Sequence, residues 1–160
     1  MRSLSIIAAV ALSLVSLPAR AGDLAPLDKV LGAWVSPDGA SRVTYESRFD
    51  GHWIDTKMWF KQGEEWKPVG QGGVYRHTSD GRIISVMRTV DMIGIELFET
   101  IMSPSADGFE LSNTAYLPDG SMILTEEEWS FPEEDRWTYT VYKIEGDEQE
   151  KWFTDGWVRE

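Results

Sequence analysis

The sequence of 160 residues contains no cysteine. It therefore has no disulfide bonds, no cysteine ligands for zinc and no thiol nucleophile. Helical periodicity is also nearly absent, since only residues 25–31 (APLDKVL) favour a turn or two of helix, with a proline near the start. A chain of this length without disulfides depends on its core for stability, and it is long enough for one such core.

Basic residues are few. The chain has 15 lysines and arginines against 27 aspartates and glutamates, a formal net charge of −12 at pH 7. This acidity promotes solubility and makes nucleic acids and anionic lipid surfaces poor partners. The two histidines show no HxH or HExxH spacing, so no metal site is predicted. The sequence also has no Gly-x-Ser-x-Gly nucleophile motif and no phosphate-binding loop leading through lysine into a helix.

The one long apolar run lies at the N-terminus. Residues 4–17 follow Arg2 and precede Pro18 and the small-x-small sequence Ala19-Arg20-Ala21. This pattern is typical of a secretory signal peptide, and the run is too short to span a membrane. We therefore predict a signal peptide over residues 1–21, cleaved between Ala21 and Gly22, and one soluble domain over residues 22–160 that is periplasmic or secreted.

Turn signals divide the rest of the chain into regular segments. Asp-Gly suits a tight hairpin, because both central residues of a type I′ turn need positive φ. The intervening segments are rich in β-branched and aromatic residues, and several alternate between two faces. In the stretch RFDGHWIDTKMWFKQGEEW, residues 48–66, the side chains of Ile54, Met58 and Phe60 share one face. Asp-Gly pairs stand at Asp38-Gly39, Asp50-Gly51, Asp80-Gly81, Asp107-Gly108 and Asp119-Gly120.

About eight to ten strands joined by short hairpins predict a meander, and closure of the meander removes its two raw edges. We therefore predict an all-β fold, an up-and-down antiparallel β-barrel with a short N-terminal helix. A barrel of this size can enclose a small ligand. A two-sheet sandwich is the competing architecture, but it needs longer crossover connections than the chain provides.

Two ends of the chain carry a resemblance to a known superfamily. The predicted helix is followed by Gly32-Ala33-Trp34, and the chain ends Gly156-Trp157-Val158-Arg159. This resembles the calycin superfamily of lipocalins and fatty-acid-binding proteins, in which a Gly-x-Trp begins the first strand and a late basic residue packs on the tryptophan. The resemblance implies that Arg159 covers Trp34 in a cation–π contact worth about 0.5–2 kcal/mol.

The chain is also similar to bacterial lipocalin-like proteins of unknown function, with Gly51, Trp53, Ile54, Tyr75 and Arg159 at the matching positions. These resemblances imply a binding fold more than an enzyme fold, and no cofactor. Haem held by His52 or His77, as in some ten-stranded relatives, is the alternative; a surface or turn-capping role is favoured for both histidines.

The leading hypothesis is a small hydrophobic or amphipathic ligand inside the barrel. Arg76 or Arg88 would anchor an acidic head group through a charge-assisted hydrogen bond. No oligomeric state is predicted. The expected lining and anchoring residues are Tyr45, Met58, Phe60, Tyr75, Arg76, Met87, Arg88, Glu127, Trp129 and Tyr139.

An enzyme on the same barrel is the second hypothesis. Glu127 alternates with apolar and aromatic neighbours, and Glu99 shares a predicted face with Leu97 and Ile101. A carboxyl on an apolar face is desolvated, which raises its pKa toward that of an acid or base near neutral pH. Isomerase, hydratase or hydrolase chemistry would use one of these glutamates, with His77 near the mouth. The competing interpretation is a structural ion pair in the wall.

A third hypothesis uses the outer surface. The chain has eight tryptophans, and Trp53 and Trp59 lie opposite the face of Ile54 and Met58. Together with Trp66 they would form a protein- or carbohydrate-binding surface if they point outward.

Overall fold

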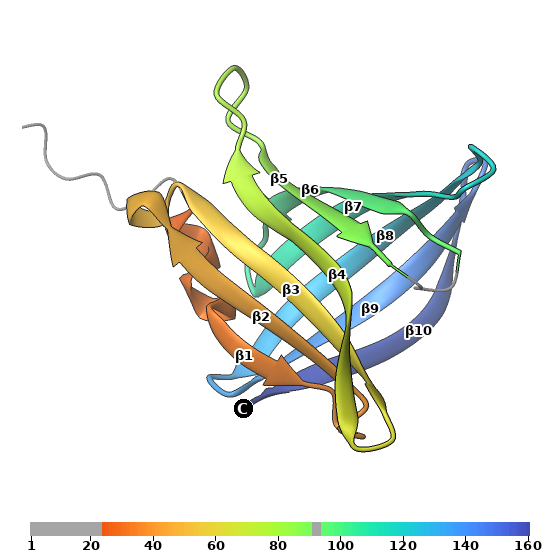
Figure 1. The fold of residues 1–160 in the computed structure, drawn as a ribbon. Coiled ribbons are helices and arrows are strands. Elements are labelled where there is room, and N and C mark those ends of the chain that lie inside the picture. The colour runs from red at the N-terminus through yellow and green to blue at the C-terminus, as the bar shows by residue number, and fades with distance from the viewer. Residues whose placement is uncertain (1–23, 91–93) are drawn as a thin grey trace, which may run out of the picture.

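The structure of the protein is a computed structural model that describes residues 24–90 and 94–160. Ten strands form one closed antiparallel barrel in which neighbours in sequence pair and β1 meets β10, as Figure 1 shows. The predicted all-β up-and-down barrel is confirmed, and the predicted signal peptide lies outside the described residues. The elements are the 3-10 helices η1 (Ala25–Val30) and η2 (Phe49–Gly51) and the strands β1 (Gly32–Val35), β2 (Ser41–Arg48), β3 (Trp53–Gln62), β4 (Glu65–Arg76), β5 (Ile83–Thr89), β6 (Leu97–Pro104), β7 (Gly108–Tyr116), β8 (Met122–Glu133), β9 (Arg136–Glu145) and β10 (Glu148–Arg159).

Asp-Gly turns form hairpins as the sequence predicts. In the turn between β7 and β8, Gly120 has a φ of 82°, which a residue with a side chain rarely adopts. The Asp119 carboxylate accepts hydrogen bonds from the hydroxyl and the backbone N–H of Ser121, at 2.6 and 2.9 Å. These bonds hold the pKa of Asp119 below its usual range. The side chain and the glycine therefore define the turn together.

The first and last strands close the barrel. Trp34 pairs with Arg159 across β1 and β10, and the guanidinium lies 4.2 Å from the centroid of the Trp34 ring. Arg159 Nη1 also donates a hydrogen bond to the carbonyl oxygen of Leu31 at 2.7 Å. Gly32 has a φ of 119°, and a Cβ at this position would lie 2.8 Å from Arg159 Nη1. The structure thus places Arg159 on Trp34, as the resemblance implies, and gives Gly32 a steric reason to be glycine.

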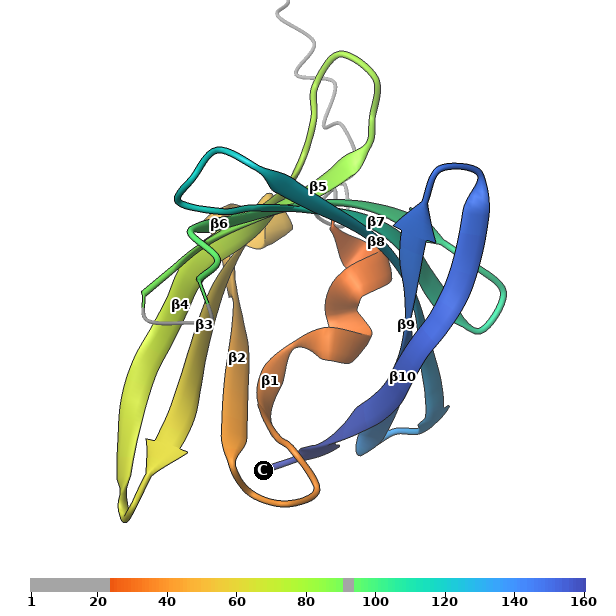
Figure 2. The ribbon, with the colours of Figure 1, turned by 90° about the vertical axis from the view of Figure 1, so that its right-hand side faces the viewer.

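The helix η1 fills the end of the barrel beside this contact. Leu27 and Val30 are 0% and 1% exposed, and Trp34 Nε1 donates a hydrogen bond to the Val30 carbonyl oxygen at 2.7 Å. Figure 2 shows η1 lying within the ring of strands. Burial of an aliphatic side chain of this size stabilises a fold by about 1.5–3 kcal/mol. This apolar helix therefore closes one end of the interior.

Strand β3 alternates as the sequence predicts. Ile54 and Thr56 are buried inside the barrel and Met58 follows them on the same face. Trp53 and Asp55 lie on the outer face, where Trp53 Nε1 donates a hydrogen bond to the Asp55 carboxylate at 2.7 Å. The stretch over residues 48–66 is therefore a wall of the barrel.

Strand β6 corrects a sequence-based expectation. Phe98, Thr100 and Met102 face the interior, whereas Glu99 is exposed on the outside. The segment LFETIM carries apolar side chains on both faces, so alternation alone does not determine which face is buried. The expectation that Glu99 lies on a buried face was wrong.

The barrel wall is incomplete along β10. This strand pairs with β1 only through Val158 and Arg159. Within the part of the chain that the structure describes, the rest of β10 pairs with β9 alone, so one edge of it carries unpaired backbone groups. A bulge between Lys151 and Phe153 interrupts the pairing with β9, and Trp152 beside it is 61% exposed. Irregular pairing of this kind is one way in which proteins limit aggregation at a strand edge.

Candidate ligand-binding cavity

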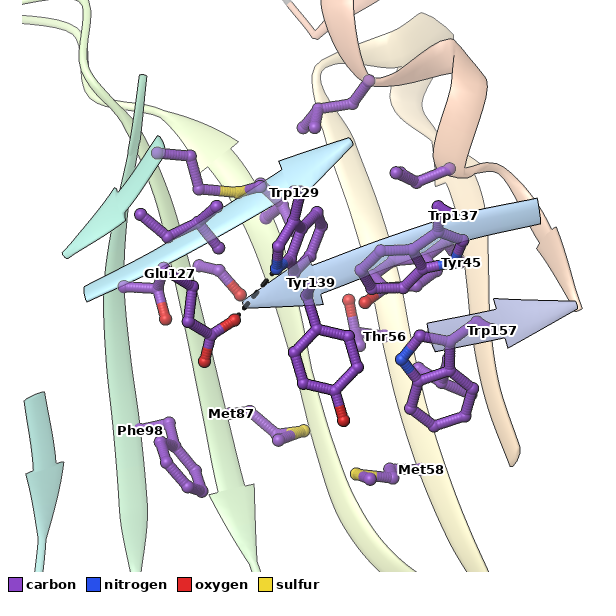
Figure 3. Close-up of a pocket in the computed structure, with 18 residues that line it drawn as sticks. Tyr45, Thr56, Met58, Met87, Phe98, Glu127, Trp129, Trp137, Tyr139 and Trp157 are labelled. Atoms are coloured by element: carbon purple, nitrogen blue, oxygen red, sulfur yellow. Dashed lines mark hydrogen bonds between the residues drawn. The ribbon is translucent and has the colours of Figure 1, made fainter. Parts of the chain in front are cut away.

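A cavity of about 200 Å³ lies inside the barrel, and Figure 3 shows the side chains around it. A cavity of about 150 Å³ is sufficient to hold benzene, so this one accommodates a slightly larger molecule. Helix η1 and strands on all sides of the barrel contribute to its lining. The lining residues are Leu27, Val30, Val43, Tyr45, Thr56, Met58, Val74, Ser85, Met87, Phe98, Thr100, Met102, Leu111, Glu127, Trp129, Trp137, Tyr139 and Trp157.

Six side chains that the sequence assigned to ligand binding line this cavity. They come from five different strands, and their convergence follows from the inward alternation of each strand. Their role in binding remains a prediction. These six residues are Tyr45, Met58, Met87, Glu127, Trp129 and Tyr139.

Four others lie away from the cavity, so their assignment to its lining was wrong. Tyr75 is on the outer face, where its ring stacks on Trp53 at 5.8 Å. Arg88 is exposed on the outside of β5. Arg76 lies at the end of β4, and its Nη1 donates a hydrogen bond to the Gly81 carbonyl oxygen at 2.6 Å.

Phe60 is displaced for a different reason. It shares the inward face with Met58 by alternation, but the pairing of β3 with β4 shifts between Met58 and Trp59. Phe60 then pairs with Lys67 in the outer part of the β3–β4 hairpin, beyond the residues that line the cavity. The residue that this shift leaves unpaired is Val69 of β4, so β3 itself stays regular. Phe60 therefore misses the cavity because of its position far along the hairpin.

Glu127 is the acidic residue that faces the cavity. It lies in the middle of β8 between the buried residues Leu111 of β7 and Val141 of β9. One carboxylate oxygen accepts a hydrogen bond from Trp129 Nε1 at 2.9 Å, drawn as the dashed line in Figure 3. Burial raises the pKa of the Glu127 carboxyl, and hydrogen bonds from Trp129 and Asn113 oppose part of that shift.

Protein surrounds the Glu127 carboxyl, yet its side chain stays partly exposed because it opens onto the cavity. Two tyrosines face the same space. Burial, together with the negative charge of Glu127, raises the pKa of Tyr45, and burial with the charges of Asp155 and Glu127 raises that of Tyr139. Both phenols therefore remain neutral hydrogen-bonding groups at physiological pH.

Two buried polar atoms among the lining residues have no hydrogen-bond partner within the described parts of the chain. They are Thr56 Oγ1 and Trp137 Nε1. Thr100 provides a contrast, because its buried hydroxyl donates a hydrogen bond to Asn113 Oδ1 at 2.7 Å. An unsatisfied buried polar group costs about 1–3 kcal/mol, so the hydroxyl of Thr56 lowers the stability of the barrel.

Aromatic rings pack around the closed part of the cavity. Trp137 is at their centre, with its ring 4.3 Å from that of Trp129 and 6.0 Å from that of Trp157. Trp137, Trp157 and Phe98 also line the cavity but were not among the predicted lining residues. For Trp137 the signal was present, because it alternates with Tyr139 along β9 and so had to share its face.

The other residues of the enzyme hypothesis do not join Glu127. Glu99 is exposed on the outer surface of β6. His77 lies in the turn after β4, where its Nδ1 is 3.1 Å from the Asp80 carboxylate and 3.0 Å from the Ser79 hydroxyl. The turn-capping interpretation of His77 matches this position, and neither Glu99 nor His77 lines the cavity that Glu127 faces.

The outward tryptophans are partly covered. The ring of Trp53 stacks on Tyr75 and lies against Gly73, where a Cβ would approach it to 2.1 Å. The guanidinium of Arg42 lies 5.4 Å from the centroid of Trp59. Trp66, which is 36% exposed, is the most open of the three rings in the surface hypothesis. These neighbours reduce the ring surface of Trp53 and Trp59 that is open to a sugar.

Within residues 24–90 and 94–160, no three histidine or carboxylate side chains converge in a way that could hold a metal ion. None of the helices in those ranges is both long and apolar enough to span a membrane. Comparison of the sequence with known protein families and with curated proteins finds no match.

Proposed function

We propose that this protein is a lipocalin-like binding protein that takes a small hydrophobic or amphipathic molecule into its barrel. The observation that carries the proposal is a largely apolar cavity into which Glu127, Tyr45 and Tyr139 bring a few polar groups. Apolar walls with a few convergent polar groups are the usual design of a small-molecule site. The ten-stranded barrel and the Arg159–Trp34 closure are compatible with the calycin resemblance. Because the N-terminal segment over residues 4–17 is apolar, we further propose that the protein acts outside the cytoplasm.

Native mass spectrometry and organic extraction of the purified protein test whether a small molecule accompanies it. A direct titration uses 2-phenylethanol, a neutral molecule with one ring and one hydroxyl, followed by calorimetry. Binding is expected in the wild-type protein. Absence of both a co-purifying molecule and 2-phenylethanol binding would contradict the proposal.

Two variants locate the binding. Ser85 lines the cavity, whereas Val86 is the next residue of β5 and points to the outside. Ser85→Phe fills the cavity and is expected to abolish 2-phenylethanol binding, while Val86→Phe adds the same ring outside and keeps it. Equal binding by both variants would place the molecule elsewhere. Circular dichroism checks that each variant keeps its strand content.

The position of Glu127 supports an enzyme as a second candidate. Its carboxyl meets open space that Tyr45 and Tyr139 also line, which is an arrangement suited to general acid catalysis. The molecule that co-purifies with the Glu127→Gln variant distinguishes an enzyme from a binding protein. If the protein is an enzyme, the variant co-purifies with a chemically different molecule, the unconverted substrate. The same molecule in both proteins supports binding alone.

A further inference from the structure

The charges around the cavity bear on the kind of molecule that it takes. Among the described residues that line it, none is a lysine, arginine or histidine, and Glu127 is the one carboxylic acid. The two arginines that the sequence offered as anchors for an acidic head group lie elsewhere. An anionic ligand would therefore enter a poorly solvated site that holds a carboxyl group and no counter-charge.

Aromatic rings line the cavity that the carboxyl faces. Trp129 donates its Nε1–H to Glu127, and Tyr45, Phe98 and Tyr139 line the same space. These four side chains come from β2, β6, β8 and β9, and Figure 3 shows them around the cavity. Ring faces attract an ammonium group within about 6 Å by about 0.5–2 kcal/mol. The formal charge of −12 also raises the local concentration of cations and lowers that of anions.

Size limits the rest of the molecule. A cavity of about 200 Å³ exceeds by a modest amount the space that benzene needs, so it encloses one ring or a short apolar chain with a polar group attached. A long acyl chain would have to extend out of the barrel. The apolar walls, including Leu111, Met87 and Met102, suit the apolar part of such a molecule.

From this arrangement we infer that the ligand is a small organic amine whose ammonium group pairs with the Glu127 carboxylate among the aromatic rings, while its apolar part fills the remaining cavity. This inference rests on the proposed binding function and narrows it to a ligand class. The amine supplies the positive charge that the lining lacks, so the carboxylate is neutralised within the cavity without a basic side chain.

Three probes of nearly equal size test the charge preference: 2-phenylethylamine, 2-phenylethanol and phenylacetate, which are cationic, neutral and anionic at pH 7. Calorimetric titration of the wild-type protein is expected to give the tightest binding for the amine, by about tenfold or more over the alcohol, with phenylacetate the weakest. Binding of the alcohol or of phenylacetate as tight as that of the amine would overturn the inference.

Glu127→Gln removes the charge and keeps the shape of the side chain. We expect the amine to bind about tenfold more weakly or worse to this variant, while the affinity for 2-phenylethanol changes by less than about threefold. Retained alcohol binding also shows that the variant is folded with its cavity intact. The matched control is Glu99→Gln on the outer surface, which should leave both affinities unchanged.

Different results would contradict the amine inference and the proposed binding function. If 2-phenylethanol binds but the amine shows no preference, or if Glu127→Gln leaves amine binding unchanged, the amine inference is wrong and the binding function stands. If none of the three probes binds to the wild-type protein and no small molecule co-purifies with it, both are wrong.

Discussion

Arg159→Ala removes the contact that joins the two ends of the chain. The guanidinium lies 4.2 Å from the centroid of Trp34 and donates hydrogen bonds to the carbonyl oxygens of Leu31 at 2.7 Å and Lys29 at 3.2 Å. A third hydrogen bond reaches the carbonyl oxygen of Glu134 at 3.4 Å. The substitution therefore takes away a cation–π contact and three hydrogen bonds. It leaves three carbonyl oxygens that water can reach, because Arg159 is an exposed residue.

The expected loss follows from these contacts. An exposed cation–π contact contributes about 0.5–1 kcal/mol, and each hydrogen bond contributes about 0.5–1.5 kcal/mol net. The total is about 2–3 kcal/mol when the solvent exposure of the arginine is considered. For a domain of this size 1 kcal/mol shifts the unfolding temperature by about 2–4 °C, so Tm should fall by about 5–10 °C.

Thermal and urea unfolding followed by circular dichroism measure this loss. Arg42→Ala is the matched control, because Arg42 also lies over a tryptophan, with 5.4 Å between its guanidinium and the Trp59 centroid. Arg42 also forms a solvent-exposed ion pair with Glu160, which contributes little. We expect the control to cost less than about 1 kcal/mol. Equal effects of the two substitutions, or an Arg159→Ala protein as stable as wild type, would refute the reasoning.

Other predictions concern the interior and the first strand. Burial raises the pKa of Glu127, so the folded protein keeps this proton to a higher pH than the unfolded chain does. The stability that results is present at low pH and is lost as the pH rises through the raised pKa. Thermal unfolding between about pH 4 and about pH 8 should therefore show Glu127→Gln gaining stability relative to wild type as pH rises. A stability difference that does not depend on pH would count against the desolvation of Glu127. Thr56→Val replaces a buried hydroxyl without a protein partner and should stabilise the ligand-free protein by about 1 kcal/mol, whereas Thr100→Val breaks the hydrogen bond to Asn113 and should destabilise it by about 1–2 kcal/mol. Urea unfolding separates the two threonine variants, and a loss of stability in both would mean that Thr56 has a partner inside the protein. Gly32→Ala should lower Tm, because φ is 119° and the new Cβ would meet Arg159 Nη1 at 2.8 Å; an unchanged Tm would show that β1 can shift freely.

The fold was predictable because its signals are local and repeated. Asp-Gly pairs such as Asp119-Gly120 define hairpins within a few residues. A series of hairpins leaves two unpaired strand edges, and closure into a barrel pairs them. The position of Arg159 on Trp34 came from the resemblance, since the two residues are far apart in sequence. The residue that makes this contact possible, Gly32, is explained only by coordinates, because its φ and its approach to Arg159 are three-dimensional facts.

The cavity was harder to predict because it depends on which face of each strand is inside. Glu127 was placed correctly because Trp129 and Phe131 mark its face as apolar. Adjacent residues of a strand point to opposite faces, so Met87 and Arg88 could not both line the interior, and the apolar side chain took that position. Tyr75 and Arg76 are also adjacent, so they could not both face the interior, and neither of them lines the cavity.

Other errors arose where pattern carries no information. Both faces of β6 carry apolar side chains, so alternation did not show that Glu99 lies outside. Phe60 lies in the outer part of the β3–β4 hairpin, and alternation does not show how far along a strand the cavity extends. The unpartnered hydroxyl of Thr56 is a property of packing, because the same residue type finds a partner at Thr100. Sequence therefore predicts the wall of such a barrel better than the polar groups inside it.

A crystal structure of the protein grown with 2-phenylethanol tests the central claim most directly. The account predicts electron density for the ring inside the barrel next to Met87 and Trp129. A barrel interior filled by its own side chains, or the ligand found only on the outer surface, would contradict it.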